Sequence, residues 1–113
     1  MQWAKLTVDG NLIVKDSQAD LRELQDCVGG YIEAVYLEDA VMFCNEEGKL
    51  DGLPRNELAT ELAQTDKAIM TSDWIAGHVA IVGMTNDDTG DSLPLTEDAL
   101  TRIRMILTGE GVA

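Results

Sequence analysis

The stretch from Asn45 to Asn56, NEEGKLDGLPRN, concentrates polar side chains that could bind a ligand or take part in catalysis. It combines carboxylates, cations and amides within a short, glycine-containing segment. Polar loops held between rigid elements are common recognition sites. The sequence therefore predicts a binding surface in this stretch. Asp73, further along the chain, is a further candidate for the same surface. The candidate binding residues are Asn45, Glu46, Glu47, Lys49, Arg55, Asn56 and Asp73.

The same stretch also has a purely structural explanation. Asn45 suits a tight turn, and Gly48 is free to adopt positive φ there. Asn56 suits a helix N-cap, and Glu57 would lie in the first turn, where the helix dipole favours a negative charge. Glu46, Glu47 and Arg55 have no expected place in a hydrophobic core, so we expect them at the surface. Turn chemistry is the simpler explanation, and both explanations remain open.

Known catalytic, metal-binding and phosphate-binding patterns do not fit this chain. Glu46 and Glu47 are adjacent, so on an extended chain their carboxylates point apart and form no acid–base pair. His78, the single histidine, lies in an apolar run, where a packed or edge histidine is expected. Residues 86–91, NDDTGD, depart from the calcium-loop pattern at its first position, Thr85, and favour a solvated turn. We therefore expect no catalytic residue, no bound metal and no cofactor.

Charge is the most unusual property of the chain. Twenty-one acidic residues against eight basic ones give a net charge of −13. Direct binding to nucleic-acid phosphates or to an acidic membrane is disfavoured, because such contacts require Lys or Arg. Three explanations fit the composition: an acidic surface that aids solubility, adaptation to a salty cytoplasm, and mimicry of a nucleic acid.

Cys27 and Cys44 bear on whether the protein lies in a reducing or an oxidising compartment. Both lie at apolar positions of different expected elements and have no metal-site spacing, so buried free thiols are expected. The N-terminus carries no signal-peptide pattern, and the longest apolar run, 75–84, is too short to span a membrane. These observations favour a reducing cytoplasm.

Periodicity predicts an α+β fold in a single domain over residues 1–113, with a mixed or antiparallel sheet of about five strands and three helices mainly on one face. Gly29 and Gly30 are expected to close the first helix. In order, the expected elements are a β-hairpin (3–8 and 12–14), a helix (18–28) capped by Ser17 with Asp20, a second hairpin (31–37 and 40–44), a helix (56–64), a buried central strand (75–83), and a helix capped by Thr96 that buries Leu100, Ile103 and Leu107, with 108–113 frayed.

Several pieces of the chain resemble the signature of a small domain of unknown function that occurs in bacteria, especially actinobacteria, and in phages. These pieces are VGGYIEAV, NEEGKL and GLPRN, followed by Ala59 and Thr60. Asp73, Ile75 and Gly77 are similar to a further pattern of that family, which precedes its final apolar strand. The resemblance covers most of the chain. It implies a compact α/β domain and a link to mobile elements, and it supplies no catalytic residues.

Taken together, these features predict a non-enzymatic binding protein, encoded by a phage or mobile element, that acts on a host protein or a small effector molecule in the host cytoplasm. One alternative is an acidic decoy that occupies the nucleic-acid site of a basic host enzyme. A second alternative is a small enzyme that uses Glu46, Arg55 and Asn56 together with Asp73. Neither direct nucleic-acid binding nor membrane binding is expected, and the composition leaves the oligomeric state open.

The net charge generates a first prediction about stability. Self-repulsion among the acidic groups destabilises the compact state, and salt screens it with a Debye length of about 8 Å at physiological ionic strength. We expect the urea midpoint at neutral pH to rise between low and moderate sodium chloride. A midpoint that stays flat or falls would contradict this expectation.

Overall fold

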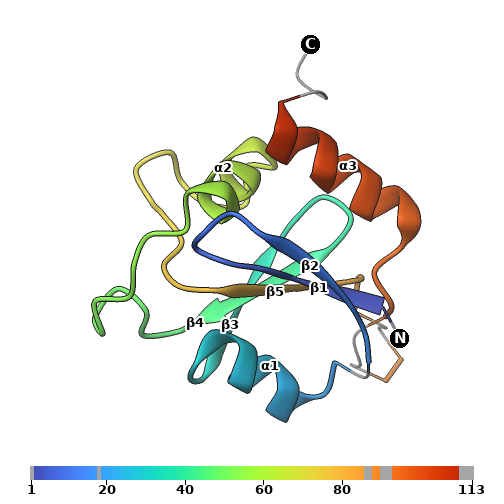
Figure 1. The fold of residues 1–113 in the computed structure, drawn as a ribbon, viewed down its shortest axis with the longest axis horizontal. Coiled ribbons are helices and arrows are strands. Elements are labelled where there is room, and N and C mark those ends of the chain that lie inside the picture. The colour runs from blue at the N-terminus through green and yellow to red at the C-terminus, as the bar shows by residue number, and fades with distance from the viewer. Residues whose placement is uncertain (1, 18, 86–87, 90–92, 110–113) are drawn as a thin grey trace.

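The computed structural model describes residues 2–17, 19–85, 88–89 and 93–109, and it shows an α+β fold (Figure 1). One antiparallel sheet has the strand order β2-β1-β5-β4-β3, as predicted for the fold class. Helices α2 and α3 cover one face of the sheet, and α1 covers the other. The elements are β1 (Gln2–Leu6), β2 (Leu12–Asp16), α1 (Leu21–Val28), β3 (Ile32–Tyr36), β4 (Val41–Asn45), α2 (Glu57–Thr65), β5 (Val79–Val82) and α3 (Glu97–Thr108).

Strand β5 is the central strand, as its continuous apolar sequence predicted. All four of its residues are buried, because helices cover both faces of the sheet. Val79 and Ile81 point into the core under α2 and α3, whereas Ala80 and Val82 point toward α1. The strand begins later than the predicted residue 75. The preceding residues instead form a connecting segment that ends at Gly77, whose φ of +83° suits a residue without a Cβ atom.

Two hydrophobic cores lie on opposite faces of the sheet. The smaller one packs α1 against the sheet and centres on the buried ring of Trp3. The larger one lies under α2 and α3, and it includes Leu6, Met42, Leu62 and Ile103. Each side chain of this size stabilises the fold by about 1.5–3 kcal/mol when fully buried. The central strands therefore contribute to both cores through alternate residues.

The helix ends confirm most of the predicted signals and correct one. Asp20, not Ser17, is the N-cap of α1, since its carboxylate accepts the Glu23 N–H at 2.8 Å. The Ser17 hydroxyl instead accepts a bond from the Trp3 indole and donates one to Glu23. Gly29 closes α1 with φ +79°, as predicted.

Helix α3 also begins as predicted. The Thr96 hydroxyl accepts the Ala99 N–H at 3.1 Å and so caps the helix. Ile103 is fully buried, Ile106 is buried as well, and Leu107 is only partly buried. Residues 110–113 of the predicted frayed tail lie outside the described residues, as do 86–87 and 90–91 of the NDDTGD loop.

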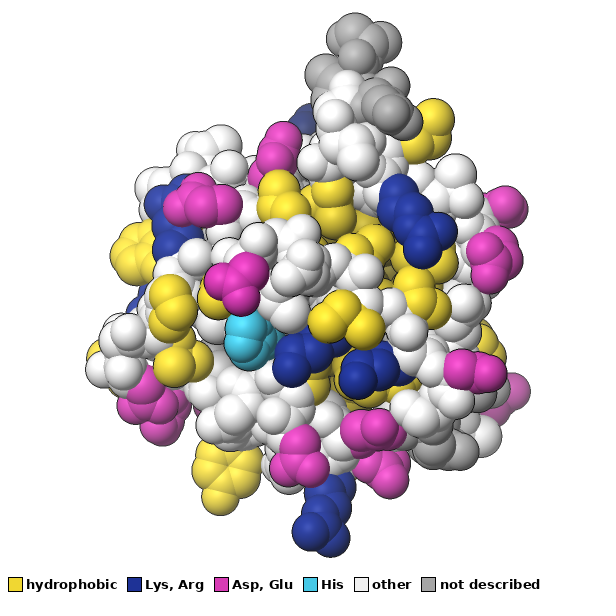
Figure 2. Space-filling model, viewed as in Figure 1, with side chains coloured by type: hydrophobic (Ala, Val, Ile, Leu, Met, Phe, Trp, Pro, Cys, Tyr) yellow, Lys and Arg dark blue, Asp and Glu magenta, His cyan; other side chains and the backbone are white. Residues whose placement is uncertain are grey.

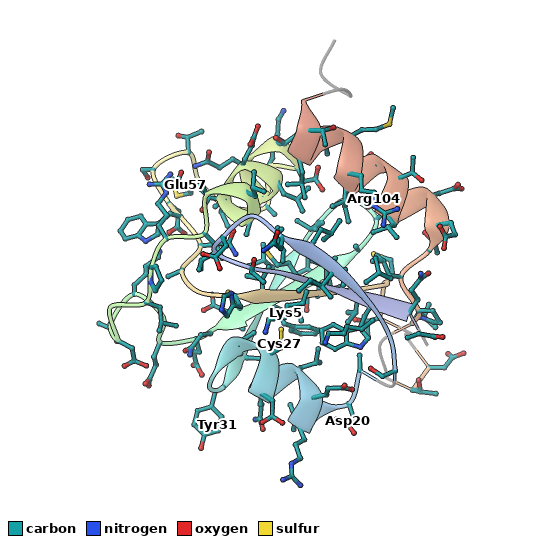
Figure 3. All side chains as sticks on the ribbon, in the orientation of Figure 1. Lys5, Asp20, Cys27, Tyr31, Glu57 and Arg104 are labelled. Carbon is teal, nitrogen blue, oxygen red and sulfur yellow. The ribbon has the colours of Figure 1, made fainter. Side chains whose placement is uncertain are left out.

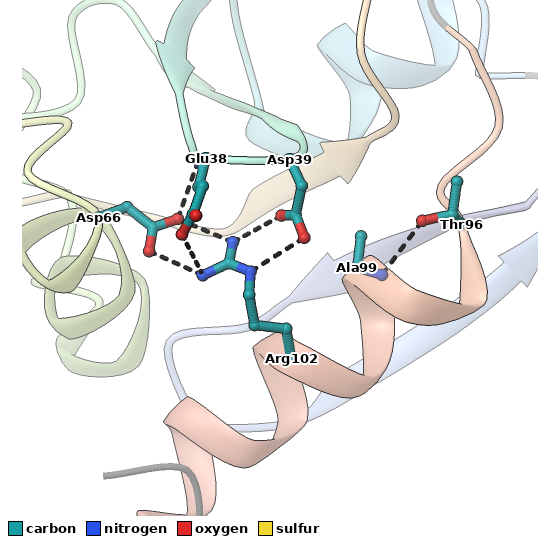
Figure 4. A network of polar contacts seen from close by, with 6 residues as sticks. All are labelled: Glu38, Asp39, Asp66, Thr96, Ala99 and Arg102. Carbon is teal, nitrogen blue, oxygen red and sulfur yellow. Dashed lines mark hydrogen bonds and ion pairs between the residues drawn. The ribbon is translucent and has the colours of Figure 1, made fainter. Parts of the chain in front are cut away.

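The half-buried Arg102 joins α3 to the end of α2 and to the turn between β3 and β4 (Figure 4). The Arg102 guanidinium donates to both oxygens of Asp39, in the turn between β3 and β4, and to both oxygens of Asp66, the C-cap of α2. The bonds are 2.6–3.0 Å long. Such planar, two-pronged pairing suits arginine rather than lysine. These contacts raise the pKa of Arg102 above its usual value, chiefly through the bonds to Asp39.

Both cysteines are buried and free, as predicted. Cys27 points from α1 toward the sheet (Figure 3), where its thiol donates to the Val79 carbonyl at 3.7 Å. Cys44 donates to the Glu33 carbonyl at the same distance. Burial raises the pKa of Cys27, and it raises the pKa of Cys44 to about 11 with a further contribution from the Glu33 charge. Both thiols therefore stay protonated at neutral pH.

None of the helices in the described ranges is both long and apolar enough to cross a membrane.

Thiol reactivity provides a second prediction. The thiolate is the reactive form, and burial with a raised pKa suppresses it. We expect slow labelling of native protein at pH 7.5 and rapid labelling in urea, with Cys27→Ser and Cys44→Ser assigning the two rates. A native Cys27–Cys44 disulfide, or labelling as fast in native protein as in urea, would refute this prediction.

Candidate functional site

The loop after β4 lies against the segment that leads into β5. Backbone bonds join the two: the Asn56 N–H donates to Ile75 at 2.8 Å, and the Gly77 N–H donates to Pro54 at 2.7 Å. Arg55 and Ala76 form an isolated antiparallel bridge between these bonds. Residues far apart in sequence are thereby fixed side by side at one end of the sheet.

Helix α2 holds the same segment through a row of polar side chains. The buried Thr60 hydroxyl accepts the Ile75 N–H at 2.9 Å and donates to the Asn56 carbonyl. The Gln64 amide donates to the carbonyls of Thr71 and Asp73 at 3.1 and 3.0 Å. Residues spaced by four lie on one face of a helix, so Asn56, Thr60 and Gln64 form one row. This row fixes the backbone that presents Asp73 and Trp74.

Asn56 begins this row and is fully buried. Its side-chain oxygen accepts the Ala59 N–H at 3.0 Å and so caps α2, as the sequence predicted. Its amide donates to the carbonyls of Leu6 at 3.1 Å and Gly77 at 3.0 Å. One side chain therefore joins the end of β1, the start of α2 and the segment before β5.

A hollow of about 280 Å³ opens beside this segment, and we call it the Trp74 hollow. It is formed by β3, β4, the loop after β4 and the segment before β5. Its floor is apolar and its rim is charged. The lining residues are Glu33, Val35, Cys44, Asn45, Glu46, Lys49, Leu50, Ile69, Asp73, Trp74, Ile75 and Ala76.

Three side chains at the hollow lie in contact with one another. The Lys49 ammonium pairs with the Asp73 carboxylate and also lies 4.5 Å from the centre of the Trp74 ring. The same carboxylate accepts the backbone N–H of Trp74 at 2.8 Å. The bond from Lys49, followed by that from Trp74, holds the pKa of Asp73 below its usual range. The result is a positioned cation, an ionised carboxylate and a partly exposed indole side by side.

The predicted binding residues divide into two groups. Glu46, Lys49 and Asp73 line the Trp74 hollow. Asn45 lines it as well, but its side chain forms hydrogen bonds within the protein. The buried Asn45 amide donates to Val28, and its oxygen accepts the Glu47 N–H at 2.8 Å.

Glu47, Arg55 and Asn56 do not line this hollow. Glu46, Glu47 and Arg55 are exposed, as expected, and Arg55 pairs with Glu57. The expectation of positive φ at Gly48 is wrong, because Gly52 adopts it instead. Gly48 is needed for space: an added Cβ would lie 3.2 Å from the Ala76 carbonyl oxygen.

Sequence reasoning missed Trp74, Glu33, Thr60 and Gln64. The spacing of four from Asn56 to Thr60 and from Thr60 to Gln64 was the available signal for these two residues. Trp74, directly after Asp73, was an aromatic residue beside a chosen candidate. Glu33 had no signal of its own, since a charged residue on one face of an edge strand is common.

His78 lies outside the Trp74 hollow, in a half-buried position where its Nδ1 accepts the Val8 N–H at 3.1 Å. This agrees with the expectation of a packed histidine. Across the described ranges, no three His, Cys, Asp or Glu side chains are grouped so that they could hold a metal ion.

The fold and this hollow define a small α+β domain with a charged, aromatic-rimmed surface hollow. The chain belongs to the family described as domain of unknown function DUF3846, whose sequence model matches residues 3–108. No curated protein matches the chain, and no solved structure matches it either.

The buried position of Asn56 generates a third prediction. Asn56→Ala removes the α2 cap and the two buried bonds that the amide donates to the Leu6 and Gly77 carbonyls, so we expect a loss of about 3 kcal/mol in the free energy of unfolding. The control is Asp20→Ala, which removes only the exposed cap of α1 and should cost about 1 kcal/mol. Urea denaturation measures both. Equal losses for the two variants would show that the buried amide joins nothing beyond its own helix.

Proposed function

We propose that this chain is a non-enzymatic binding module whose ligand site is the Trp74 hollow. The observation that carries the proposal is the Lys49–Asp73–Trp74 cluster. It presents a cation, an anion and an aromatic face next to one another beside an apolar floor. Binding sites commonly combine an apolar lining with a few well-placed polar groups, and aromatic anchors dominate many protein interfaces.

The protonation states in the hollow support recognition rather than chemistry. A general acid or base works best when its pKa lies near the working pH. The pKa of Asp73 is lowered away from neutrality, and that of Cys44 is raised to about 11. The carboxylate therefore stays charged and the thiol stays neutral. Groups that keep one state through the physiological range are suited to holding a ligand.

The exposure of the Lys49–Asp73 pair also supports a binding role. Both side chains are more than 40% exposed, and such pairs usually contribute about 0–1 kcal/mol to stability. Trp74 is 39% exposed and Leu50 is 88% exposed, so large apolar groups face solvent around the pair. Apolar surface rimmed by polar groups is typical of interaction sites.

For the biological setting, we propose a phage or mobile-element protein that acts in the host cytoplasm on a host protein or a small effector molecule. The support is the resemblance of VGGYIEAV, NEEGKL and GLPRN to a domain found in bacteria and phages. The two buried free cysteines fit a reducing compartment.

The two alternative functions have less structural support. An enzyme built from Glu46, Arg55, Asn56 and Asp73 would need these groups in one pocket, yet Arg55 and Asn56 lie outside the hollow. A nucleic-acid decoy needs a surface of one sign. On the face shown in Figure 2, Lys and Arg side chains lie among the acidic ones, so this face does not meet that need.

Partner capture tests the proposal as a fourth prediction. Immobilised wild-type chain is exposed to host lysate at two salt concentrations, and bound proteins and small molecules are identified by mass spectrometry. Lys49→Met and Trp74→Ala should each reduce the captured partner at least tenfold, because they remove the cation and the aromatic face. Both side chains are exposed, so the folded state should change little.

Arg55→Met provides the matched control. This substitution also removes a cation from the loop after β4. The Arg55 side chain, however, pairs with Glu57 and does not line the hollow. Retention of the partner by this variant, together with loss by Lys49→Met, places binding at the hollow. If Arg55→Met loses the partner and Lys49→Met keeps it, the proposed site is wrong.

A further inference from the structure

Strand β3 forms one edge of the sheet, and its outward backbone groups are unpaired. The Leu37 N–H donates to Ala40 and the Glu46 N–H donates to Tyr31, which fixes the pattern of the β3–β4 ladder. In an antiparallel pair the bonded residues alternate. Glu33 and Val35 therefore bond to β4, whereas the backbone groups of the residues between and beside them point away from the sheet. These are Ile32, Ala34 and Tyr36, and no other bond reaches their backbones from the described part of the chain.

An open groove runs along this edge on the α2 side. It lies between β3 and the loop at 67–73, and its lining includes Glu33, Val35, Ile69 and Met70. Glu33, Val35, Ile69 and Asp73 also line the Trp74 hollow, so the groove and the hollow adjoin. Met70 is 75% exposed, which leaves apolar surface beside the free edge.

The charge of this region selects the kind of partner. Glu33 and Glu46 are exposed carboxylates that form no ion pair within the described ranges. Lys67 is an exposed cation at the far side of the groove, but the whole chain carries a net charge of −13. A second copy of the chain would bring equal charge to the edge and would be repelled. A cationic segment would instead be attracted.

We propose that the partner of this module is an extended cationic peptide segment that adds to the sheet as a strand along β3. Its backbone pairs with Ile32, Ala34 and Tyr36, and its alternate side chains face the groove. A basic side chain there reaches Glu33, and the adjoining hollow accepts the neighbouring part of the partner. Backbone pairing supplies affinity in this mode, while pockets for alternate side chains supply specificity. The inference rests on the proposed binding function.

A blocked heptapeptide of alternating Lys and Val, beginning and ending with Lys, is a suitable probe. Titration at low salt is followed by amide NMR shifts and by hydrogen exchange of the protein. We expect binding that weakens with added salt, with slower exchange at Ile32, Ala34 and Tyr36. The same peptide with Glu in place of Lys should bind at least tenfold more weakly.

N-methylated peptides test the backbone pairing directly. The N–H groups of alternate residues in a strand point to the same edge, so methylation of the Val amides blocks one edge and methylation of the Lys amides blocks the other. One of the two peptides should lose binding at least tenfold and the other should keep it. The peptide that fails reports the direction of the added strand. Equal binding by both would overturn strand addition.

Proline substitution tests the protein side. Ala34→Pro removes an outward N–H from the β3 edge without removing a ladder bond. It should weaken binding of the Lys–Val peptide at least tenfold. Val14→Pro is the matched control, because by the same alternation its N–H points outward at the β2 edge. If Ala34→Pro fails to fold, the exposed Glu33→Lys replaces it, and it should reverse the preference between the Lys and Glu peptides.

Other outcomes would overturn the inference. These are no binding of the Lys–Val peptide at low salt, exchange protection at β2 rather than β3, or self-association of the chain that Ala34→Pro abolishes. If the peptide fails while Lys49→Met and Trp74→Ala still abolish partner capture, the strand-addition inference is wrong and the binding function stands. If those two variants also keep their partner, both proposals are wrong.

Discussion

The arrangement of this domain depends on one buried amide, that of Asn56. A buried polar group without a partner is costly, so its two donors and its acceptor must all be satisfied. They are satisfied only when the end of β1, the first turn of α2 and the segment before β5 meet at one point. The apolar cores drive these elements together without direction, and Asn56 determines how they are aligned. The position of the Trp74 hollow follows from that alignment.

Stability and the proposed recognition depend on different polar groups. The row of Asn56, Thr60 and Gln64, of which Asn56 and Thr60 are buried, fixes the backbone of the segment before β5. The exposed Lys49–Asp73 pair, by contrast, lies in solvent, where ion pairs contribute little to folding. The Arg102 contacts belong to the first kind, since they lock α3 to α2 and to the β3–β4 turn. Side chains at the hollow can therefore change with little cost to the fold.

The acidic composition acts at the level of the whole molecule. A net charge of −13 opposes self-association of a sheet that ends in an unpaired edge at β3. Charged side chains on edge strands have the same effect locally, and Glu33 occupies such a position. The same charge that opposes contact between identical copies would attract the cationic partner proposed above.

The sequence by itself determined the fold class, the central place of β5 and most helix ends. These depend on local patterns: a continuous apolar run, the two-residue period of strands, and capping residues next to the helices they serve. It missed the cap of α1, because Ser17 and Asp20 both fit a local signal, and only the path of the chain decided between them. The candidate site was predicted in part, through Glu46, Lys49 and Asp73. Only the tertiary structure placed Trp74 and Glu33 beside them and turned Asn45 and Asn56 inward, because contacts between distant segments have no signal in local spacing.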